Sequence, residues 1–124
     1  MATQRRQMYK CDICGAVVEI LDSGCGSLVC CSNRMTLVNE ASASADAAHR
    51  PLVTCDDGML SVSVGQSPHP MENEHFIEWI EVVADGAICR HFLQPGQPAQ
   101  TTFDMPAAEV TVRGYCSLHG LWKG

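Results

Sequence analysis

Residues 76–93, FIEWIEVVADGAICRHFL, carry the clearest strand signal in the chain. β-branched and aromatic residues lie on both sides of Asp85-Gly86, a pair typical of the tight turn of a β-hairpin. The first half also has apolar residues at helical spacing, but its β-branched content and the following Asp-Gly favour strands. The stretch therefore predicts an antiparallel hairpin between Phe76–Ala84 and Ile88–Leu93.

Signals of the same kind recur on both sides of this hairpin. Leu60, Val62 and Val64 alternate with serines, which is the pattern of a half-buried strand. Turn residues at 56–58 and 95–96 separate further strand segments, namely Pro51–Cys55, Thr101–Met105 and Glu109–Cys116. Six or seven short strands at such spacing predict an all-β chain with an antiparallel β-sandwich.

Length and charge exclude several classes of protein. The chain has 124 residues and 46% hydrophobic content, and no run approaches the ~18 apolar residues of a membrane span. The first ten residues, MATQRRQMYK, lack the apolar core of a secretory signal. A formal net charge of −6, with only 8 lysines and arginines, argues against nucleic acid as a partner.

The cysteine-rich stretch at 8–38 predicts a metal site. Cys11 and Cys14 bracket a tight loop. Two short strand signals follow, Ala16–Leu21 and Ser27–Cys31, and the adjacent Cys30 and Cys31 end the second of them. Four thiolates form a tetrahedral site for zinc or iron, and sequence alone does not separate the two metals. Two disulfides or free core thiols are the alternative, and Cys25 is expected to be a spare surface thiol. Neighbouring strand side chains point to opposite faces, so the backbone must bend at the adjacent pair.

Composition also suggests where the domains divide. Residues 39–48, NEASASADAA, are small and low in complexity, as in a linker or exposed loop. We therefore expect a small metal domain over 1–38, a linker over 39–48 and the sandwich over 49–124. Thiolate ligands suit a reducing interior, which predicts a cytoplasmic protein.

A second set of metal donors is spread over the sandwich region. It comprises four imidazoles and one thiolate: His49, His69, His75, Cys116 and His119. A single histidine is more often a surface or core residue than a ligand. Taken together, however, five such donors suit iron with one open coordination position, and such a centre is reactive rather than structural.

The sequence motifs resemble those of a known family, the desulfoferrodoxins, which are two-iron superoxide reductases. The resemblance covers nearly the whole chain through YKCDICGAVVEIL, LVCC, HPMENEHFIEWIEVVADG, FLQPG and YCSLHGLWK. It implies a desulforedoxin-like N-terminal domain with an Fe(Cys)4 centre at Cys11, Cys14, Cys30 and Cys31. It also implies an immunoglobulin-like β-sandwich with a second iron, which takes His49, His69, His75 and His119 equatorially and Cys116 axially.

The resemblance further implies the activity and its partners. Superoxide is reduced by one electron to hydrogen peroxide, and an external donor, typically rubredoxin, then re-reduces the iron. The axial thiolate of Cys116 increases the electron density at the iron. The family forms homodimers.

One motif departs from the family pattern. A Glu-Lys pair usually precedes the first histidine, but here these positions are Ala47 and Ala48. Arg50 is a candidate substitute for the lysine charge. Without the glutamate, the oxidised iron is expected to bind water, hydroxide or an added anion, and Glu72 and Glu74 are the candidates if a carboxylate binds instead. The alternatives to an active enzyme are a non-catalytic electron carrier or structural metalloprotein, and a zinc-ribbon interaction module on a β-sandwich.

The remaining histidine and cysteines of the strand segments are predicted to be ordinary strand residues. His91 matches no ligand position of the family and is expected to be an exposed strand residue. Cys55 and Cys89 are expected to be buried or half-buried thiols.

Overall fold

The structure is a computed structural model that describes residues 2–38, 50–56, 58–65, 69–84, 86–104, 110–117 and 120–123. The chain divides into two compact units, Met1–Val38 and Asn39–Gly124, and each is described by itself. All regular elements among the described residues are β-strands, which confirms the all-β prediction. No helix long and apolar enough to cross a membrane occurs among these residues. The expected linker 39–48, with Ala47 and Ala48, and two expected ligands, His49 and His119, lie outside them.

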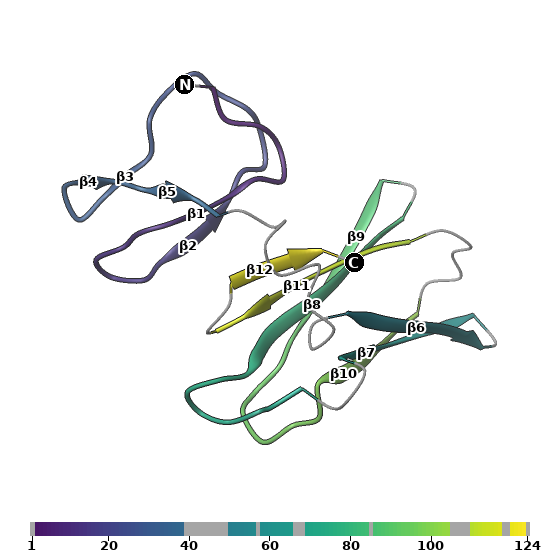
Figure 1. Ribbon diagram of the computed structural model, residues 1–124. Helices are drawn as coiled ribbons and strands as arrows, with labels where there is room; N and C mark the ends of the chain where they lie inside the picture. The colour runs from purple at the N-terminus through teal and green to yellow at the C-terminus, as the bar shows by residue number, and fades with distance from the viewer. Residues whose placement is uncertain are drawn as a thin grey trace. The chain divides into compact units, whose positions relative to one another are not determined.

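The first unit consists of short strands joined by loops (Figure 1). One antiparallel sheet has the order β2-β1-β5, and β3 pairs with β4 in a separate hairpin. The strands are β1 (Met8–Lys10), β2 (Val17–Glu19), β3 (Val29–Cys30), β4 (Asn33–Arg34) and β5 (Thr36–Leu37). Among the described residues, the buried hydrophobic side chains of this unit are Met8, Cys11 and Ile20. A unit with so small a hydrophobic core usually needs a metal ion or another cross-link to stay folded.

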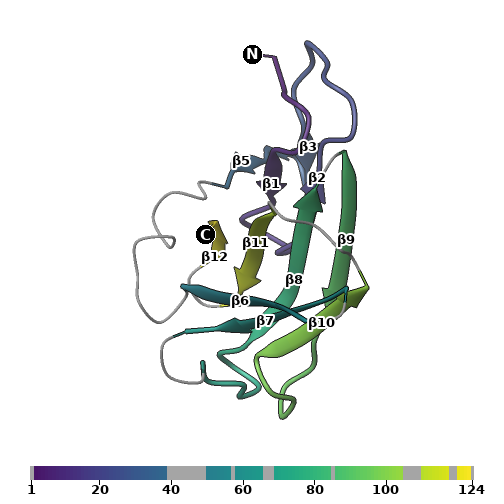
Figure 2. The ribbon, with the colours of Figure 1, turned by 90° about the vertical axis from the view of Figure 1, so that its right-hand side faces the viewer.

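The second unit is a sandwich of two antiparallel sheets that face each other (Figure 2). A three-stranded sheet has the order β10-β7-β6, and a four-stranded sheet has the order β12-β11-β8-β9. The strands are β6 (Pro51–Asp56), β7 (Met59–Val64), β8 (Ile77–Ala84), β9 (Ala87–Phe92), β10 (Gln100–Asp104), β11 (Thr111–Cys116) and β12 (Gly120–Lys123). All of the predicted strands are present. β12, which follows the predicted ligands Cys116 and His119, was not predicted as a strand.

The predicted hairpin is formed by β8 and β9. Their register runs from Trp79 opposite Phe92 to Ala84 opposite Ala87, which leaves a two-residue connection. Gly86 in this connection has a φ of 78°, a conformation that glycine adopts without steric cost. The Asp-Gly signal therefore predicted the turn correctly.

The core lies between the two sheets. Leu60, Val62 and Val64 of β7 are each 1% exposed, as their alternation with serines predicts. They pack in one cluster with residues of the facing sheet, including Ile80 and Val82 of β8. Burying an aliphatic side chain of this size contributes about 1.5–3 kcal/mol, so this cluster supplies the main stabilisation of the sandwich.

A buried ionic row crosses the four-stranded sheet. Glu81 of β8 is fully buried and lies opposite Arg113 of β11 and Arg90 of β9 in the strand register. Both arginines donate hydrogen bonds to its carboxylate. The Arg90 guanidinium also lies 4.7 Å from the ring centroid of Trp79. Glu81 interrupts the apolar run of β8 in sequence, and pairing with charges on both neighbouring strands is what permits its burial.

Gly114 of β11 is required by the close approach of Trp122. The two residues are opposite each other in the register, and the Trp122 ring is fully buried. A Cβ at position 114 would lie 2.6 Å from Cε2 of that ring, closer than real carbon contacts. Trp122 therefore occupies the space that a side chain at Gly114 would need.

We expect Gly114→Ala to lower the free energy of unfolding by about 1–3 kcal/mol, because the buried indole has to move. Chemical denaturation followed by tryptophan fluorescence measures the change. Gly96→Ala serves as a packing control, since a Cβ at Gly96 has no heavy atom within 4 Å, although its φ of 90° is itself unfavourable for alanine. An unchanged unfolding midpoint in Gly114→Ala would contradict the packing argument.

Two predictions about isolated strand residues were wrong. Cys55 is exposed, because β6 is an edge strand whose residues 52–56 are all exposed. His91 is half-buried rather than exposed, because its ring stacks on Phe103 with the centroids 4.3 Å apart. Cys89 is half-buried and Cys25 is exposed, as predicted.

Candidate metal centres

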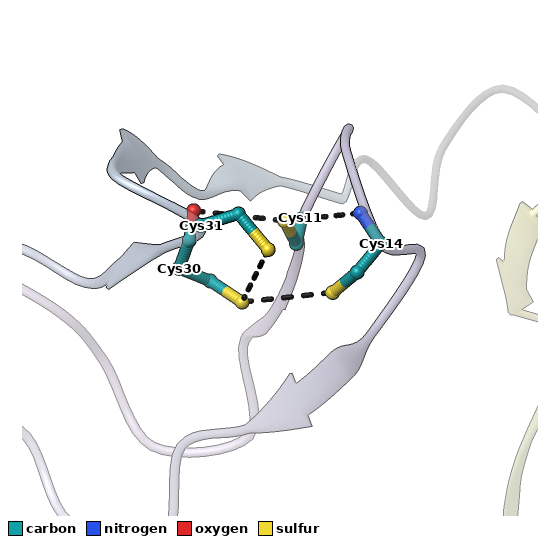
Figure 3. A group of neighbouring side chains, drawn as sticks. All are labelled: Cys11, Cys14, Cys30 and Cys31. Atoms are coloured by element: carbon teal, nitrogen blue, oxygen red, sulfur yellow. Dashed lines mark hydrogen bonds between the residues drawn. The ribbon is translucent and has the colours of Figure 1, made fainter.

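Cys11, Cys14, Cys30 and Cys31 converge on one point in the first unit (Figure 3). Two come from the loop that follows β1, and two come from the end of β3 and the turn after it. Their sulfur atoms all lie within 4.8 Å of one another. Cys11 is buried, Cys30 is half-buried, and the other two are exposed.

Hydrogen bonds from backbone N–H groups hold the loop at Cys11 and Cys14 in a tight turn. The N–H of Gly15 donates to the carbonyl of Cys11 at 2.9 Å, and Gly15 adopts a φ of 83°. The N–H of Cys14 lies 3.5 Å from the sulfur of Cys11 and donates to it. This tight turn presents both sulfur atoms to the same side.

The adjacent cysteines share the centre because the backbone bends, as the sequence predicts. Cys31 has a φ of 54° and Ser32 a φ of 65°, both in the left-handed region. Residues other than glycine occupy this region at a cost of order 1–3 kcal/mol each. The sulfur atoms of Cys30 and Cys31 are consequently 3.9 Å apart instead of pointing to opposite faces.

The cluster fits a metal ion better than disulfides. The sulfur atoms of Cys14 and Cys30 are 3.6 Å apart, and all described cysteines are free thiols. A disulfide requires a separation of about 2.05 Å. Four sulfurs bound at ~2.3 Å to one tetrahedral ion lie roughly 3.8 Å apart, close to the separations found here.

The thiols of this cluster differ in acidity. The N–H of Cys14, and then that of Ile13, stabilise the Cys11 thiolate and lower its pKa from 9.0 to about 6. Hydrogen bonding with the thiols of Cys11, Cys14 and Cys31 raises the pKa of Cys30 to about 12. The pKa of Cys31 is also raised, chiefly by the Cys14 thiol. Without a cation, Cys11 therefore ionises readily, whereas Cys30 and Cys31 resist ionisation.

Metal affinity at this cluster should rise with pH. At pH 7 Cys30 and Cys31 carry protons that a metal has to displace, and each displaced proton changes the affinity about tenfold per pH unit. The protons of Cys30 and Cys31 should thus make the logarithm of the affinity rise with a slope of about two just above pH 7. Below about pH 6 Cys11 is protonated as well, and the slope should increase by about one. Cobalt(II) titration of metal-free protein, followed by thiolate absorption, measures this slope. An affinity independent of pH would contradict the expectation.

A second cluster, in the sandwich unit, contains His69, His75 and Cys116. Their donor atoms all lie within 4.8 Å of one another. His69 lies in the connection between β7 and β8, His75 lies two residues before β8, and Cys116 ends β11. Cys116 is fully buried, and His69 is 4% exposed. Imidazole and thiolate donors together suit a mid-first-row metal such as iron.

The orientation of His69 identifies its donor atom. Its Nδ1 lies 2.8 Å from the carbonyl oxygen of Pro70, which can only accept a hydrogen bond. Nδ1 therefore carries the proton, and the lone pair is on Nε2. This Nε2 lies 3.7 Å from the sulfur of Cys116. A backbone partner of this kind commonly orients a metal-binding histidine.

His75 stands edge-on to His69 and is held by backbone pairing. The two ring centroids are 4.8 Å apart, with an interplanar angle of 81°. His75 and Glu72 exchange two backbone hydrogen bonds, of 2.9 and 3.1 Å, across the short connection. The backbone pairing thus closes the end of the connection that carries His75.

A bulge and a serine connect this loop to the strand that carries Cys116. The β8–β11 register shifts between Tyr115 and Cys116, and such bulges commonly redirect a side chain at a functional site. The N–H of Phe76 donates to Oγ of Ser117 at 3.0 Å, and the N–H of Ser117 donates to the carbonyl of Phe76 at 2.9 Å. Sequence reasoning missed Ser117, although its position directly after a candidate ligand was the available signal.

The remaining candidates around the second cluster are only partly described. His49 and His119 lie outside the described residues, and so do Ala47 and Ala48. Arg50, Glu72 and Glu74 are exposed.

The sequence and the fold are similar to those of known proteins. The sequence matches the family model described as Desulfoferrodoxin over residues 41–124, and the model of the desulfoferrodoxin N-terminal domain over residues 3–38. It is 45% identical to a desulfoferrodoxin of Desulfarculus baarsii, over 97% of this chain and 96% of the relative. It is 44% identical to a desulfoferrodoxin of Nitratidesulfovibrio vulgaris, over 94% of each chain. The crystal structure of the superoxide reductase from Treponema pallidum superposes with a TM-score of 0.76 at 26% identity, over 95% of each chain.

Proposed function

Because the chain belongs to the desulfoferrodoxin family, we propose that it is a superoxide reductase, an enzyme that reduces superoxide to hydrogen peroxide. The observation that carries this proposal is the convergence of His69, His75 and Cys116 within 4.8 Å in the sandwich unit. Electron transfer or a structural metal would not require this mixed donor set beside a separate four-thiol site.

The proposal assigns two iron ions to each chain. The first is Fe(Cys)4, held by Cys11, Cys14, Cys30 and Cys31 in a desulforedoxin-like domain over residues 1–38. The second is Fe(His)4(Cys) in a superoxide reductase domain over 49–124, with residues 39–48 as the linker. Its ligands are His49, His69, His75, Cys116 and His119. The donor sets and the separations of the described members support this assignment.

When bound, the second iron would supply the electron that reduces superoxide. The residues of the chain set the conditions for that electron transfer. Cys116 is fully buried in an apolar cluster, where a thiolate bound to the iron would be shielded from solvent. His69 presents Nε2 because its other nitrogen is bound to the Pro70 carbonyl, so the ring needs no reorientation during turnover.

Superoxide must be attracted by a local charge, since the formal net charge of the chain is −6. We assign part of this attraction to the exposed Arg50, which follows His49 directly. A unit charge ~7 Å from the anion contributes about 0.6 kcal/mol in water and about 2.4 kcal/mol at an effective dielectric constant of 20. These energies correspond to roughly 3-fold and about 50-fold in rate.

We expect Arg50→Ala to lower the second-order rate with superoxide about 3-fold at low ionic strength, because an exposed charge lies near the lower limit. The salt dependence of the rate should weaken at the same time. Stopped-flow measurements at several salt concentrations provide both values. Arg50→Lys, which keeps the charge, is the matched control. An unchanged rate together with an unchanged salt dependence would remove Arg50 from this role.

The proposal includes the partners and the location of the enzyme. A rubredoxin-like protein supplies electrons, the chain forms a homodimer in the cytoplasm, and neither nucleic acid nor a membrane takes part. Family membership and the acidic net charge support these assignments. Sedimentation analysis tests the dimer, and re-oxidation of reduced rubredoxin in the presence of superoxide tests the donor.

Rapid mixing of reduced protein with superoxide is the direct test of the activity. We expect oxidation of the second iron with one hydrogen peroxide per superoxide consumed and no dioxygen. Metal analysis accompanies the test. Two irons per chain without any reaction would indicate an electron carrier, and zinc in the first centre with an empty second centre would indicate an interaction module.

A further inference from the structure

Cys89 and His91 form a pair outside both candidate metal centres. They are two residues apart on β9, so their side chains share one face of an edge strand. Their register partners on β8, Val82 and Ile80, belong to the core. The pair therefore faces the interior at the open edge of the sandwich, and both residues are half-buried.

The ring of His91 is fixed from two directions. Its Nδ1 lies 2.7 Å from Oγ1 of Thr101 on β10, which belongs to the other sheet. The ring stacks on Phe103 of the same strand, with an interplanar angle of 18°. These contacts turn Nε2 toward the sulfur of Cys89, 3.8 Å away. When Nδ1 donates its proton to Thr101, Nε2 is an acceptor for the Cys89 thiol.

Thiol, imidazole and an orienting hydroxyl make the arrangement that activates cysteine nucleophiles. An open pocket of about 380 Å³ is lined by His91 and Thr101, together with Leu93 and Gln97. This pocket gives a small polar molecule access to His91. The sulfur of Cys89 lies 3.8 Å from Nε2 of that ring, and Cys89 is itself only half-buried. Cys25 and Cys55 are exposed thiols, and the described residues offer them no such histidine.

We propose that Cys89 is a peroxide-reactive thiol and that His91 is its general base. The inference rests on the proposed function for its oxidant, because hydrogen peroxide is the product of superoxide reduction. His91 takes the thiol proton, and the sulfur attacks one peroxide oxygen. The S–O bond forms as the O–O bond breaks, and the leaving hydroxide takes the proton from His91 as water. Sulfur loses two electrons and peroxide gains them, which yields a Cys89 sulfenic acid.

The test supplies hydrogen peroxide to the oxidised iron-loaded protein in the presence of dimedone, which traps sulfenic acids. Peptide mass spectrometry then compares the labelling rates of Cys89, Cys25 and Cys55 in the same sample. We expect Cys89 to be labelled fastest. Equal or slower labelling of Cys89 would overturn the proposal.

Variants of His91 and Thr101 separate the roles of these two residues. His91→Gln should lower the labelling rate of Cys89 by roughly 100-fold, the usual minimum for loss of a general base. Thr101→Val should slow it less, and Thr101→Ser, which restores the hydroxyl, should recover the rate. Labelling of Cys89 at the wild-type rate in both His91→Gln and Thr101→Val would overturn the assignment. Iron content and melting temperature are measured for each variant, so that a folding defect is recognised.

A second arm separates this inference from the proposed function. Superoxide is supplied to reduced protein with or without catalase. Because superoxide also disproportionates unaided to hydrogen peroxide and dioxygen, both products are measured in the same sample. Labelling that catalase abolishes, with one hydrogen peroxide per superoxide and no dioxygen, supports both. Labelling by added peroxide in a protein that releases dioxygen when superoxide is supplied retains the reactive thiol and counts against superoxide reduction.

Discussion

Replacing Cys116 by serine should lower the second-order rate with superoxide by more than about 100-fold. Loss of a residue that only orients a metal ligand typically costs 10–100-fold, and Cys116 is proposed as a ligand itself. The serine hydroxyl keeps its proton at neutral pH and is a weaker donor to iron than a thiolate. The side chain at this position is fully buried, so no solvent anion replaces it easily.

Stopped-flow kinetics, iron content and melting temperature together test this expectation. Cys55→Ser is the matched control, because it removes an exposed thiol of β6 in the same unit. The control should retain the wild-type rate. A Cys116→Ser protein that holds two irons and reduces superoxide at the wild-type rate would contradict the assignment of Cys116 as an iron ligand.

Replacing Cys14 by serine should unfold the first unit while superoxide reduction continues. The buried hydrophobic residues described in this unit are Met8, Cys11 and Ile20, which is too little to offset the conformational entropy of its residues. Binding of a structural metal supplies about 10–16 kcal/mol in small metal domains, and this becomes folding free energy. Loss of one of four thiolates removes much of it.

Amide hydrogen exchange resolves the effect along the chain. Protection should disappear in β1, β2 and β5 and persist in β8 and β11. Cys25→Ser removes an exposed thiol of the same unit that lies outside the cluster, and it should leave protection unchanged. If Cys14→Ser leaves the melting temperature unchanged yet abolishes superoxide reduction, the first centre serves electron transfer rather than stability.

Features that depend on near neighbours in the chain were predictable. The Asp85-Gly86 hairpin and the alternation in β7 follow from local turn chemistry and side-chain periodicity. Each half of the four-cysteine cluster follows from spacing, because Cys11 and Cys14 lie on one short loop and Cys30 and Cys31 are adjacent. The bend at Cys31 also follows, since adjacent strand residues face opposite ways.

The predictions were wrong for two residues whose exposure depends on the position of their strand in its sheet. Cys55 and His91 both lie on edge strands, and the sequence pattern does not say which strands are edges. His91 faces inward because β10 lies opposite β9, a relation between segments far apart in the chain. The burial of Glu81 likewise depends on arginines supplied by both neighbouring strands.

The amino-acid sequence by itself determined the strand content, the hairpin and the four-cysteine cluster, and it predicted that His69, His75 and Cys116 belong to one donor set. The tertiary structure alone decided how His69 and Cys116, separated by 47 positions, come within 3.7 Å. It also decided that Nε2 of His69 faces the sulfur and that Ser117 ties the two segments together. The physical reason is that local preferences act over a few residues, whereas the register of β8 against β11 depends on packing of the whole sandwich.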